Sequence, residues 1–228
     1  MSEPEYTLYY WPEAGRGEFI RVMFEEAGVP YNQVCDMVET PKAVFENGIG
    51  GYPAFAPPVL TKGKLVLAQT PVICRFLGKE FGMLPEKEED IWHAEQINMT
   101  IHDFIAEGRL VFHGRNFCES FYTQQEETKP YIAWFIKDRF WKWLGYLEKV
   151  LAQNNGGKGF VVGDKLTYVD LALLHVLRAA ASQFPEPWEK LDSIPLLKAF
   201  KDRMSERPRL KAYFASDRCR PFEGNSMM

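Results

Sequence analysis

The first part of the chain alternates between strand-like and helix-like patterns of apolar residues. Short apolar and aromatic runs predict strands at 6–11, 31–36, 59–61 and 64–68, the last two joined by a turn at Lys62-Gly63. Apolar residues at helical spacing predict helices at 17–27 and 70–80, and Gly28-Val29-Pro30 ends the first of them. The expected order is therefore strand, helix, strand, loop, hairpin, helix.

Beyond Glu88 the strand patterns fade and long helical patterns dominate. The apolar stripes predict helices at 90–112, 130–151, 167–183 and 194–205. The segment 81–87, which contains Gly82 and Pro85, is the natural linker between the two kinds of pattern. We therefore expect a small α/β domain over residues 1–82 and an all-α domain over residues 88–228.

The composition is that of an ordinary globular protein. Of the 228 residues, 46% are hydrophobic and 25% are charged, which excludes a disordered chain. The net charge of −4 and the sequence pI of about 5.7 give no support to a nucleic-acid partner. No run approaches the ~18 apolar residues of a membrane span, and the acidic N-terminus lacks a signal-peptide pattern. We expect no membrane partner either.

The four cysteines, Cys35, Cys74, Cys118 and Cys219, stand far apart in the sequence. None belongs to a C-x-x-C pair, so neither a metal site nor a thioredoxin-type redox motif is predicted. Free thiols in a reducing cytoplasm fit this spacing better than a disulfide framework.

Tyr10 ends the first predicted strand, just before a loop and a helix. Its hydroxyl would point from the carboxyl end of the strand, where open α/β sheets bind ligands. The neighbouring Tyr9 points to the opposite face, so only one of the two can supply a functional hydroxyl. From this motif alone, a functional hydroxyl and an ordinary strand aromatic are equally good interpretations.

Two further motifs flank the predicted hairpin. A cis peptide bond before Pro58 would present the backbone of Pro57 to an extended peptide ligand, and an ordinary trans loop is the alternative. Thr70, after Gln69, is predicted as a helix N-cap. The free N–H groups at such an end attract a carboxylate, although a cap without a ligand is the more common case.

Thr167 and Asp170 have the spacing of a capping box at the start of a helix. We interpret this motif as structural rather than catalytic.

Taken together, these motifs resemble those of cytosolic glutathione transferases of the tyrosine type, near the alpha, mu, pi and sigma classes. The similarity covers nearly the whole chain. It rests on five motifs. They are a Tyr-aromatic-x-x-x-Gly-Arg pattern at 10–16, a Pro-x-Leu strand entry at 58–60, a Gln-Thr pair at 69–70, the capping box at 167–170 and an Arg-Pro-x-Leu-x-x-Phe/Tyr pattern at 207–213. Each motif is weak alone, but five in this order are specific. The implied fold is a thioredoxin-like domain followed by a helical bundle.

The resemblance also assigns roles to residues. Tyr10 would donate a hydrogen bond to the sulfur of glutathione and favour the thiolate, and Arg16 would add positive potential. Gln69 and Thr70 would hold the γ-glutamyl end. Asp103 would reach the γ-glutamyl amine across a homodimer, although a lone helical aspartate is usually only solvated.

The second substrate, a small hydrophobic electrophile, is expected between the domains. The resemblance places it near Trp11, Pro12 and the inner face of the 90–112 helix, with His113 in contact. The remaining histidines, His93, His102 and His175, are expected to be surface residues or hydrogen-bonded core residues. Glutathione is expected as co-substrate, with no metal and no separate cofactor.

Two positions depart from the family pattern. The residue before the cis proline usually gives both a backbone N–H and a C=O to the ligand, but Pro57 has no N–H. One of these hydrogen bonds must be lost or replaced by water. Pro41 stands where related classes commonly have tryptophan, which leaves Lys42 as the candidate for the glycyl carboxylate, with a plain surface lysine as the equal alternative.

The resemblance therefore predicts a cytoplasmic, homodimeric enzyme that conjugates glutathione to small hydrophobic electrophiles. A glutathione-dependent isomerase or peroxidase is an alternative, because it shares the thiol-activating site. A non-catalytic ligand-binding or structural relative is a further alternative. This last alternative is disfavoured because the chain retains Tyr10, Arg16, Gln69 and Thr70. The missing N–H of Pro57 is the one feature that favours it.

Overall fold

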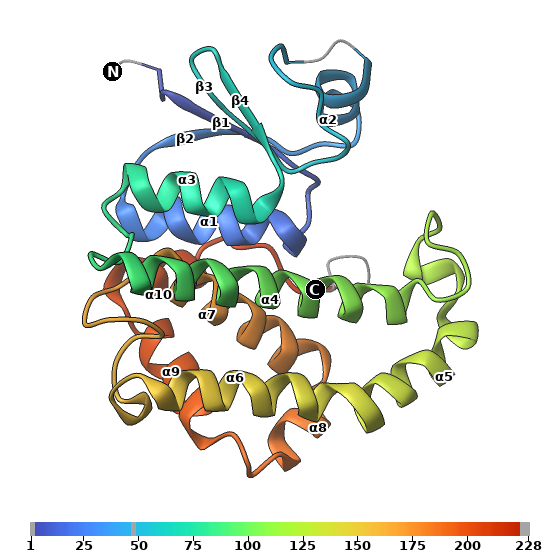
Figure 1. Cartoon of the computed structure of the whole chain (residues 1–228). Helices are drawn as coiled ribbons and strands as arrows, with labels where there is room; N and C mark the ends of the chain where they lie inside the picture. The colour runs from blue at the N-terminus through green and yellow to red at the C-terminus, as the bar shows by residue number, and fades with distance from the viewer. Residues whose placement is uncertain (1–2, 47–48, 224–228) are drawn as a thin grey trace.

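The computed structural model describes residues 3–46 and 49–223 and shows a sheet-containing half above a helical half (Figure 1). The first half contains β1 (Tyr6–Tyr9), α1 (Gly15–Ala27), β2 (Tyr31–Val34), α2 (Glu39–Pro41), a short π-helical turn η1 (Lys42–Glu46), β3 (Val59–Lys62), β4 (Leu65–Ala68) and α3 (Thr70–Glu80). The predicted order of strands and helices is therefore confirmed, and the short helical segment 39–46 is an addition to it.

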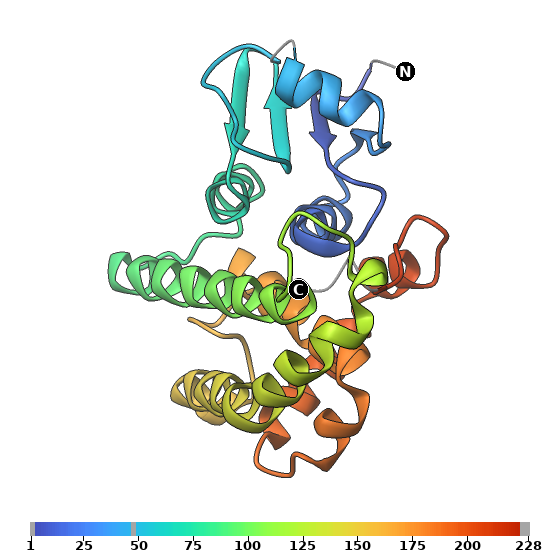
Figure 2. The ribbon, with the colours of Figure 1, turned by 90° about the vertical axis from the view of Figure 1, so that its right-hand side faces the viewer.

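The four strands form one mixed sheet in the order β2-β1-β3-β4. β1 pairs with β2 in parallel and with β3 antiparallel, and β3 and β4 form the predicted hairpin. Helices α1 and α3 lie between this sheet and the helical half (Figures 1 and 2). Because β1 is central, its carboxyl end opens onto the loop that leads to α1, where Tyr10 stands.

The second half is helical. Its elements are α4 (Glu88–Phe112), η2 (Phe121–Thr123), α5 (Gln125–Phe135), η3 (Ile136–Phe140), α6 (Trp141–Gln153), η4 (Asn155–Gly157), α7 (Tyr168–Gln183), α8 (Pro185–Lys190), α9 (Pro195–Ser205) and α10 (Pro208–Phe214). The α/β-then-α fold class is confirmed. Among the helices of the described segments, none is both long and apolar enough to cross a membrane.

The predicted start of the second long helix at Pro130 is wrong. The helical segment begins at Gln125 and runs through η3 to Gln153, with Pro130 inside α5. The reason is tertiary: Gln124 is fully buried, and its side-chain oxygen accepts hydrogen bonds from the backbone N–H groups of Arg115 and Asn116, at 3.2 and 3.1 Å. These bonds anchor the chain ahead of the proline and fix where the helix begins.

The capping box at the start of α7 is confirmed. The Asp170 carboxylate accepts hydrogen bonds from the backbone N–H and the hydroxyl of Thr167, at 2.7 and 2.8 Å, and from the N–H of Val161, at 2.6 Å. Helix α7 is buried along most of its length and contacts α1, α3 and α4. It thus connects the sheet-containing half to the rest of the bundle. The division at 82 and 88 stays a prediction, because one continuous hydrophobic core includes side chains of both halves.

Candidate functional site

Tyr10 directly follows β1, and its side chain is only 7% exposed. Its hydroxyl oxygen accepts a hydrogen bond of 2.8 Å from the backbone N–H of Arg16, at the start of α1. This approach needs glycine on both sides of Arg16, since a Cβ on Gly15 would lie 2.5 Å from the hydroxyl and a Cβ on Gly17 would overlap the ring. Gly15 also has a positive φ of 41°, which other residues rarely adopt.

Burial raises the pKa of the Tyr10 hydroxyl, and the N–H and positive charge of Arg16 and the charge of Arg21 only partly offset this effect. The hydroxyl therefore keeps its proton at neutral pH. Its oxygen already accepts one bond from Arg16, while no acceptor for its own proton lies among the described residues. Tyr10 is thus a neutral donor whose proton is available to a ligand.

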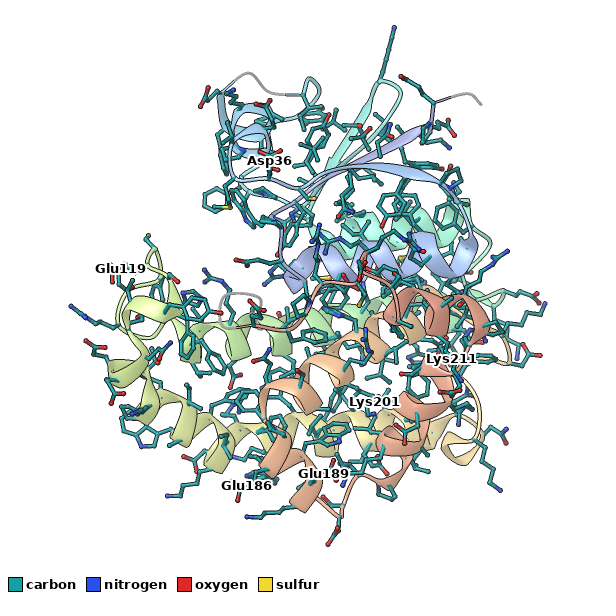
Figure 3. All side chains as sticks on the ribbon, turned by 180° about the vertical axis from the view of Figure 1, so that it is seen from behind. Asp36, Glu119, Glu186, Glu189, Lys201 and Lys211 are labelled. Carbon is teal, nitrogen blue, oxygen red and sulfur yellow. The ribbon has the colours of Figure 1, made fainter. Side chains whose placement is uncertain are left out.

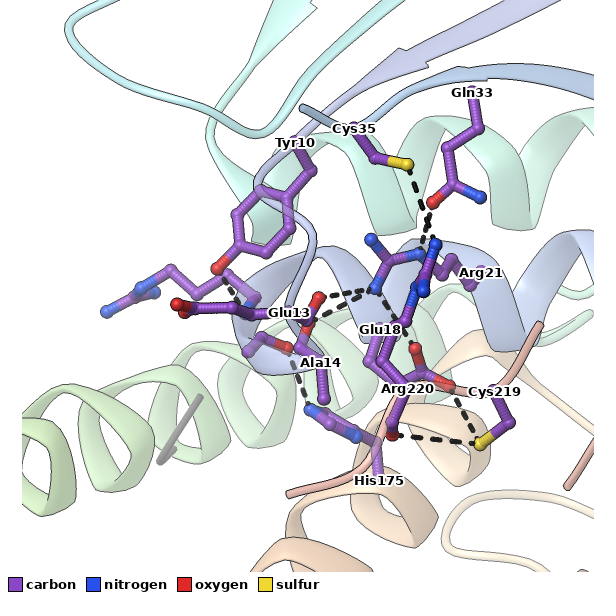
Figure 4. Close-up of polar contacts among 12 residues, drawn as sticks. Tyr10, Glu13, Ala14, Glu18, Arg21, Gln33, Cys35, His175, Cys219 and Arg220 are labelled. Carbon is purple, nitrogen blue, oxygen red and sulfur yellow. Dashed lines mark hydrogen bonds and ion pairs between the residues drawn. The ribbon is translucent and has the colours of Figure 1, made fainter. Parts of the chain in front are cut away.

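Arg21 supports this loop from inside the molecule (Figure 4). It is fully buried, forms an ion pair of 3.1 Å with Glu18 and donates to the side chain of Gln33 at 2.6 Å. The same guanidinium reaches backbone carbonyls of the loop, at 2.9 Å for Glu13, 3.3 Å for Ala14 and 3.4 Å for Trp11. The loop after Tyr10 is therefore fixed by a charged group that water does not reach.

Helix α7 contributes one further bond to this loop. His175 is buried, and its Nε2–H donates to the carbonyl oxygen of Gly15 at 3.1 Å. Burial and the nearby charge of Arg178 lower the pKa of His175 to about 3, so its ring is neutral. His175 is thus the hydrogen-bonded core residue that the sequence predicts.

His102 departs from that expectation. It is buried against Phe19, yet neither ring nitrogen has a hydrogen-bond partner in the described part of the chain. Burial, together with the charge of Arg16, lowers its pKa to about 3 and keeps it neutral. By contrast, His93 is exposed beside Glu89, as expected of a surface residue.

A cavity of about 550 Å³ lies between the two halves, in front of Tyr10. One wall comes from the first half and includes Trp11, Arg16, Met37 and the segment 55–57. The opposite wall comes from the end of α4 and the loop after it, including Arg109, His113 and the segment 117–120. Figure 3 shows Asp36 and Glu119 projecting on the same side of the molecule, one from each half.

The cavity contains several ionisable groups. Burial lowers the pKa of Arg16, and the nearby charge of Arg109 adds to the effect. Burial raises the pKa of Glu13, which Arg109 partly offsets. Burial also lowers the pKa of His113, although its Nδ1–H donates to the carbonyl of Glu119 at 2.8 Å. His113 therefore presents a neutral ring at pH 7.

The peptide bond between Pro57 and Pro58 is cis, and both prolines are buried where β3 begins. Pro57 also lines the cavity. Gln69 is exposed and has the unusual positive φ of 70°. The prediction of Thr70 as N-cap is wrong, because Gln69 holds that position and Thr70 is the first helical residue. The Thr70 hydroxyl is buried and has no partner among the described residues.

The remaining predicted site residues lie outside the lining of this cavity. Lys42 is exposed in η1 and forms a 3.0 Å ion pair with Glu39. Asp103 is exposed on α4. Pro12 is exposed in the loop after Tyr10. The structure therefore brings together Tyr10, Trp11, Arg16, Pro57 and His113. It leaves outside the cavity lining Pro12, Lys42, Pro58, Gln69, Thr70 and Asp103.

Comparison with known proteins gives a consistent result. A family model described as "Glutathione S-transferase, C-terminal domain" matches residues 114–217. A glutathione S-transferase from Plasmodium falciparum is 31% identical over 217 residues, which are 92% of this chain and 95% of the relative. The chain belongs to the glutathione S-transferase family. A bovine glutathione S-transferase P is 28% identical and covers 97% of this chain, with 98% of its own length matched.

Solved glutathione S-transferase structures share the fold. The structure titled NaGST-2 has a TM-score of 0.71 at 27% identity and covers 96% of this chain and 98% of its own. The pi-class enzyme of Onchocerca volvulus has a TM-score of 0.76 at 24% identity and covers 98% and 100%, which supports the fold alone. The predicted resemblance and the thioredoxin-like-plus-helical fold class are therefore confirmed, and the tyrosine type is consistent with the relative named glutathione S-transferase P.

Glutathione S-transferase motifs did not reveal several residues of this site. Arg109, Glu13 and Phe117 line the cavity, and Arg21 supports the loop below Tyr10. Two of these carry a sequence signal. Arg109 continues the i, i+4 stripe of Ile101 and Ile105 on α4, and Arg21 interrupts the apolar run of α1, so each places a charge where the pattern expects an apolar side chain.

Proposed function

We propose that this chain conjugates glutathione to small hydrophobic electrophiles, with Tyr10 as the group that activates the thiol. The observation that carries the proposal is the state of the Tyr10 hydroxyl. It is buried and protonated, it is oriented by the Arg16 N–H, and it borders a cavity with no acceptor for its own proton among the described residues. Membership of the family supports the transferase chemistry.

The energetic task is modest. A free thiol has a pKa of ~8.5, and moving it below neutral takes ~2 pKa units, or roughly 2–3 kcal/mol. A hydrogen bond from a neutral hydroxyl to a thiolate is charge-assisted and supplies much of this free energy. The half-buried Arg16 adds positive potential in the same cavity. The thiolate then attacks the electrophilic carbon, the S–C bond forms, and the leaving group departs with its electron pair.

We assign the rest of glutathione to the groups beside this cavity. Gln69 and Thr70 would hold the γ-glutamyl end. The buried hydroxyl of Thr70 has no hydrogen-bond partner among the described residues, so it could bond to such a ligand. The carbonyl of Pro57 would accept from the cysteinyl N–H. Lys42 would bind the glycyl carboxylate, in which case it must leave its exposed pair with Glu39. The assignments of Lys42, Gln69 and Thr70 each predict a higher KM for glutathione after substitution by alanine.

Trp11 and His113 would contact the electrophile, because both line the cavity. Pro12 stays a prediction, since its side chain lies outside the lining.

We further propose a cytoplasmic homodimer that uses glutathione as co-substrate and needs no other cofactor. In the dimer, Asp103 of one protomer would approach the γ-glutamyl amine bound to the other. The exposure of Asp103 on α4 supports this role, as do the apolar side chains of Val72 and Met99, each 50% exposed on α3 and α4. We also propose that residues 1–82 and 88–228 are the two domains.

The first test is the initial rate of conjugation of glutathione to 1-chloro-2,4-dinitrobenzene by the wild type and by Tyr10→Phe. The phenyl ring keeps the packing against Gly15 and Gly17 but removes the donor. A hydrogen bond to a charged group contributes ~1.5–3 kcal/mol, so we expect kcat/KM to fall roughly 10- to 100-fold. The pKa of bound glutathione, followed by thiolate absorbance, should rise in parallel.

Tyr9→Phe is the matched control, because Tyr9 is the adjacent tyrosine on β1 and does not line the cavity. Its kinetics should equal those of the wild type. Full activity in Tyr10→Phe would show that another group activates the thiol. A wild type that binds glutathione but conjugates nothing would favour a binding protein instead.

A further inference from the structure

The wall of the cavity that comes from α4 contains a charged side chain that the thiol chemistry does not require. Arg109 lies one turn before the end of α4 and lines the cavity together with Tyr10, Arg16 and His113. Its only hydrogen bond in the described part of the chain is a long one, 3.4 Å from Nη2 to the carbonyl of Phe117. No carboxylate oxygen of the described residues lies within 4.0 Å of either Arg16 or Arg109.

Two carboxylates line the cavity, but among the described residues neither forms an ion pair with Arg109. Glu119 is occupied elsewhere, since one oxygen accepts from the side chain of Asn116 at 2.8 Å and the other from Thr123 at 3.5 Å. Glu13 is within electrostatic range of Arg109 but forms no ion pair with it in the described chain. Among the residues that the structure describes, the cavity lining thus includes two arginines without an ion-pair partner and the carboxylate of Glu13, which forms no ion pair.

A half-buried guanidinium without a counter-ion costs free energy, because burial removes part of its hydration. A ligand that brings an anion recovers that cost, and guanidinium binds a carboxylate through two parallel hydrogen bonds. The two arginines lie on opposite walls of the cavity. Arg16 contacts Tyr10 at the proposed thiol end, and Arg109 comes from the other wall, which also includes His113 and Phe117. An anionic group on the second substrate would therefore lie beside Arg109 rather than beside Arg16.

We propose that the cavity selects electrophiles that carry a carboxylate, and that Arg109 binds this carboxylate. The inference rests on the proposed transferase function and specifies its second substrate. In the reaction with an aryl chloride, the glutathione thiolate adds to the carbon that bears chlorine. The S–C bond forms, the C–Cl bond breaks, and chloride leaves with the bonding electrons. Arg109 takes no part in these bond changes and acts by holding the distal carboxylate.

The test compares two probes of nearly equal shape, 4-chloro-3-nitrobenzoate and the uncharged 4-chloro-3-nitrobenzamide. The measured quantity is the ratio of their kcat/KM values in the wild type and in Arg109→Met, because a ratio across variants cancels their different intrinsic reactivity. A lost carboxylate–guanidinium hydrogen bond should reduce the benzoate-to-benzamide ratio about tenfold in Arg109→Met. Arg109→Lys, which keeps the charge without the fork, should lose less of the ratio.

Arg115→Met is the matched control. It removes the same charge six residues along the chain, where the arginine is exposed, pairs with Glu127 at 2.7 Å and does not line the cavity. Its ratio should equal that of the wild type. An equal ratio in the wild type and Arg109→Met would overturn the inference. So would an equal rise in the KM for glutathione with both probes, because Arg109 would then bind a carboxylate of glutathione itself.

The failure of the inference is distinguishable from failure of the proposed function. A wild type that conjugates 1-chloro-2,4-dinitrobenzene but shows no Arg109-dependent benzoate preference contradicts only the inference. If neither probe is turned over, the inference is tested by binding instead. Calorimetry then measures the affinity of the wild type and of Arg109→Met for unreactive 3-nitrobenzoate in the presence of S-methylglutathione. Binding that is about tenfold weaker in Arg109→Met supports the carboxylate site, and equal binding overturns it.

Discussion

At the scale of single residues, the position of the Tyr10 ring depends on two neighbouring glycines, Gly15 and Gly17, which have no side chain to occupy its space. The ring lies directly against the backbone of Gly15 and Gly17, so the hydroxyl can reach the Arg16 N–H. Below it, Arg21 and His175 bind the carbonyls of the same loop. The proposed thiol-activating group is therefore set in place by close backbone contact on one side and by buried polar side chains on the other.

Gly17→Ala tests this packing. A Cβ at this position would overlap the Tyr10 ring, and overpacking typically costs ~1–3 kcal/mol. We expect a lower unfolding temperature and a reduced kcat, because the ring must move away from the Arg16 N–H.

The control for this substitution is Gly145→Ala on α6, where nothing lies within 4 Å of an added Cβ. Alanine in a helix interior is better than glycine by ~1 kcal/mol, so this variant should be slightly more stable and fully active. Equal stability and activity of Gly17→Ala and the wild type would contradict the close packing. Thermal unfolding and initial rates measure both effects.

At the scale of elements, the start of α7 depends on one carboxylate. Asp170 is fully buried and accepts from two residues of the turn before it, Thr167 and Val161. Helix α7 in turn carries His175 and contacts α1. A capping motif that looks purely local in the sequence therefore positions a helix that reaches the functional site.

Asp170→Ala leaves the N–H groups of Val161 and Thr167 without their acceptor, and each such loss costs ~1–3 kcal/mol. We expect a lower free energy of unfolding, measured by urea denaturation. Burial raises the pKa of Asp170 to about 6, so the folded state holds its proton more tightly than the unfolded chain does. This contribution to stability is present at low pH and is lost as pH rises through about 6.

The stability difference between the wild type and Asp170→Ala should consequently be larger at pH 5 than at pH 7. A difference that is the same at both values, or larger at pH 7, would contradict the raised pKa.

Most elements were predictable because their apolar spacing is regular, as on α1, α4 and α7. The exceptions have physical reasons. Pro130 suggests a helix start, but the bonds of Gln124 to the preceding loop begin the helix earlier. The helices α2, α8 and α10 each have two turns or fewer, which is too short for a periodic pattern of apolar residues to reveal them.

The site residues also fall into those that the sequence predicts and those that only the tertiary fold reveals. Tyr10 and Arg16 follow from a local motif, and their contact is a property of one tight loop. Arg109 and His113 meet Tyr10 only because the end of α4 lies across the cavity from β1, and no spacing in the sequence encodes that distance. Family resemblance supplied His113, whereas the charge at 109 stands at a position the apolar stripe would fill.

At the scale of the whole molecule, the two halves are bound by a continuous interface. Helices α1 and α3 of the first half contact α7 and α4 of the second, and Phe19 on α1 packs between His102 and His175. The outer faces of α3 and α4 keep exposed apolar side chains, and Tyr52 and Phe55 are 91% and 92% exposed. Exposed apolar side chains of this kind are typical of protein–protein contact surfaces and support the proposed dimer.

Sedimentation equilibrium should therefore give twice the chain mass of 26.4 kDa. If the partner's Asp103 completes the glutathione site, Asp103→Ala should raise the KM for glutathione severalfold without changing this mass. Asp138→Ala, at another exposed aspartate, should change neither quantity. A mass of 26.4 kDa would contradict the dimer.

The bond between His175 and the carbonyl of Gly15 constrains how this protein can be recombined. A chimaera that joins residues 1–82 to the helical half of another relative keeps every residue of the Tyr10 loop. It loses the donor below that loop unless the incoming α7 has a suitable side chain at position 175. The loop that carries the proposed thiol-activating group therefore depends on a residue of the helical half, so we expect an exchange of one half alone to weaken its support.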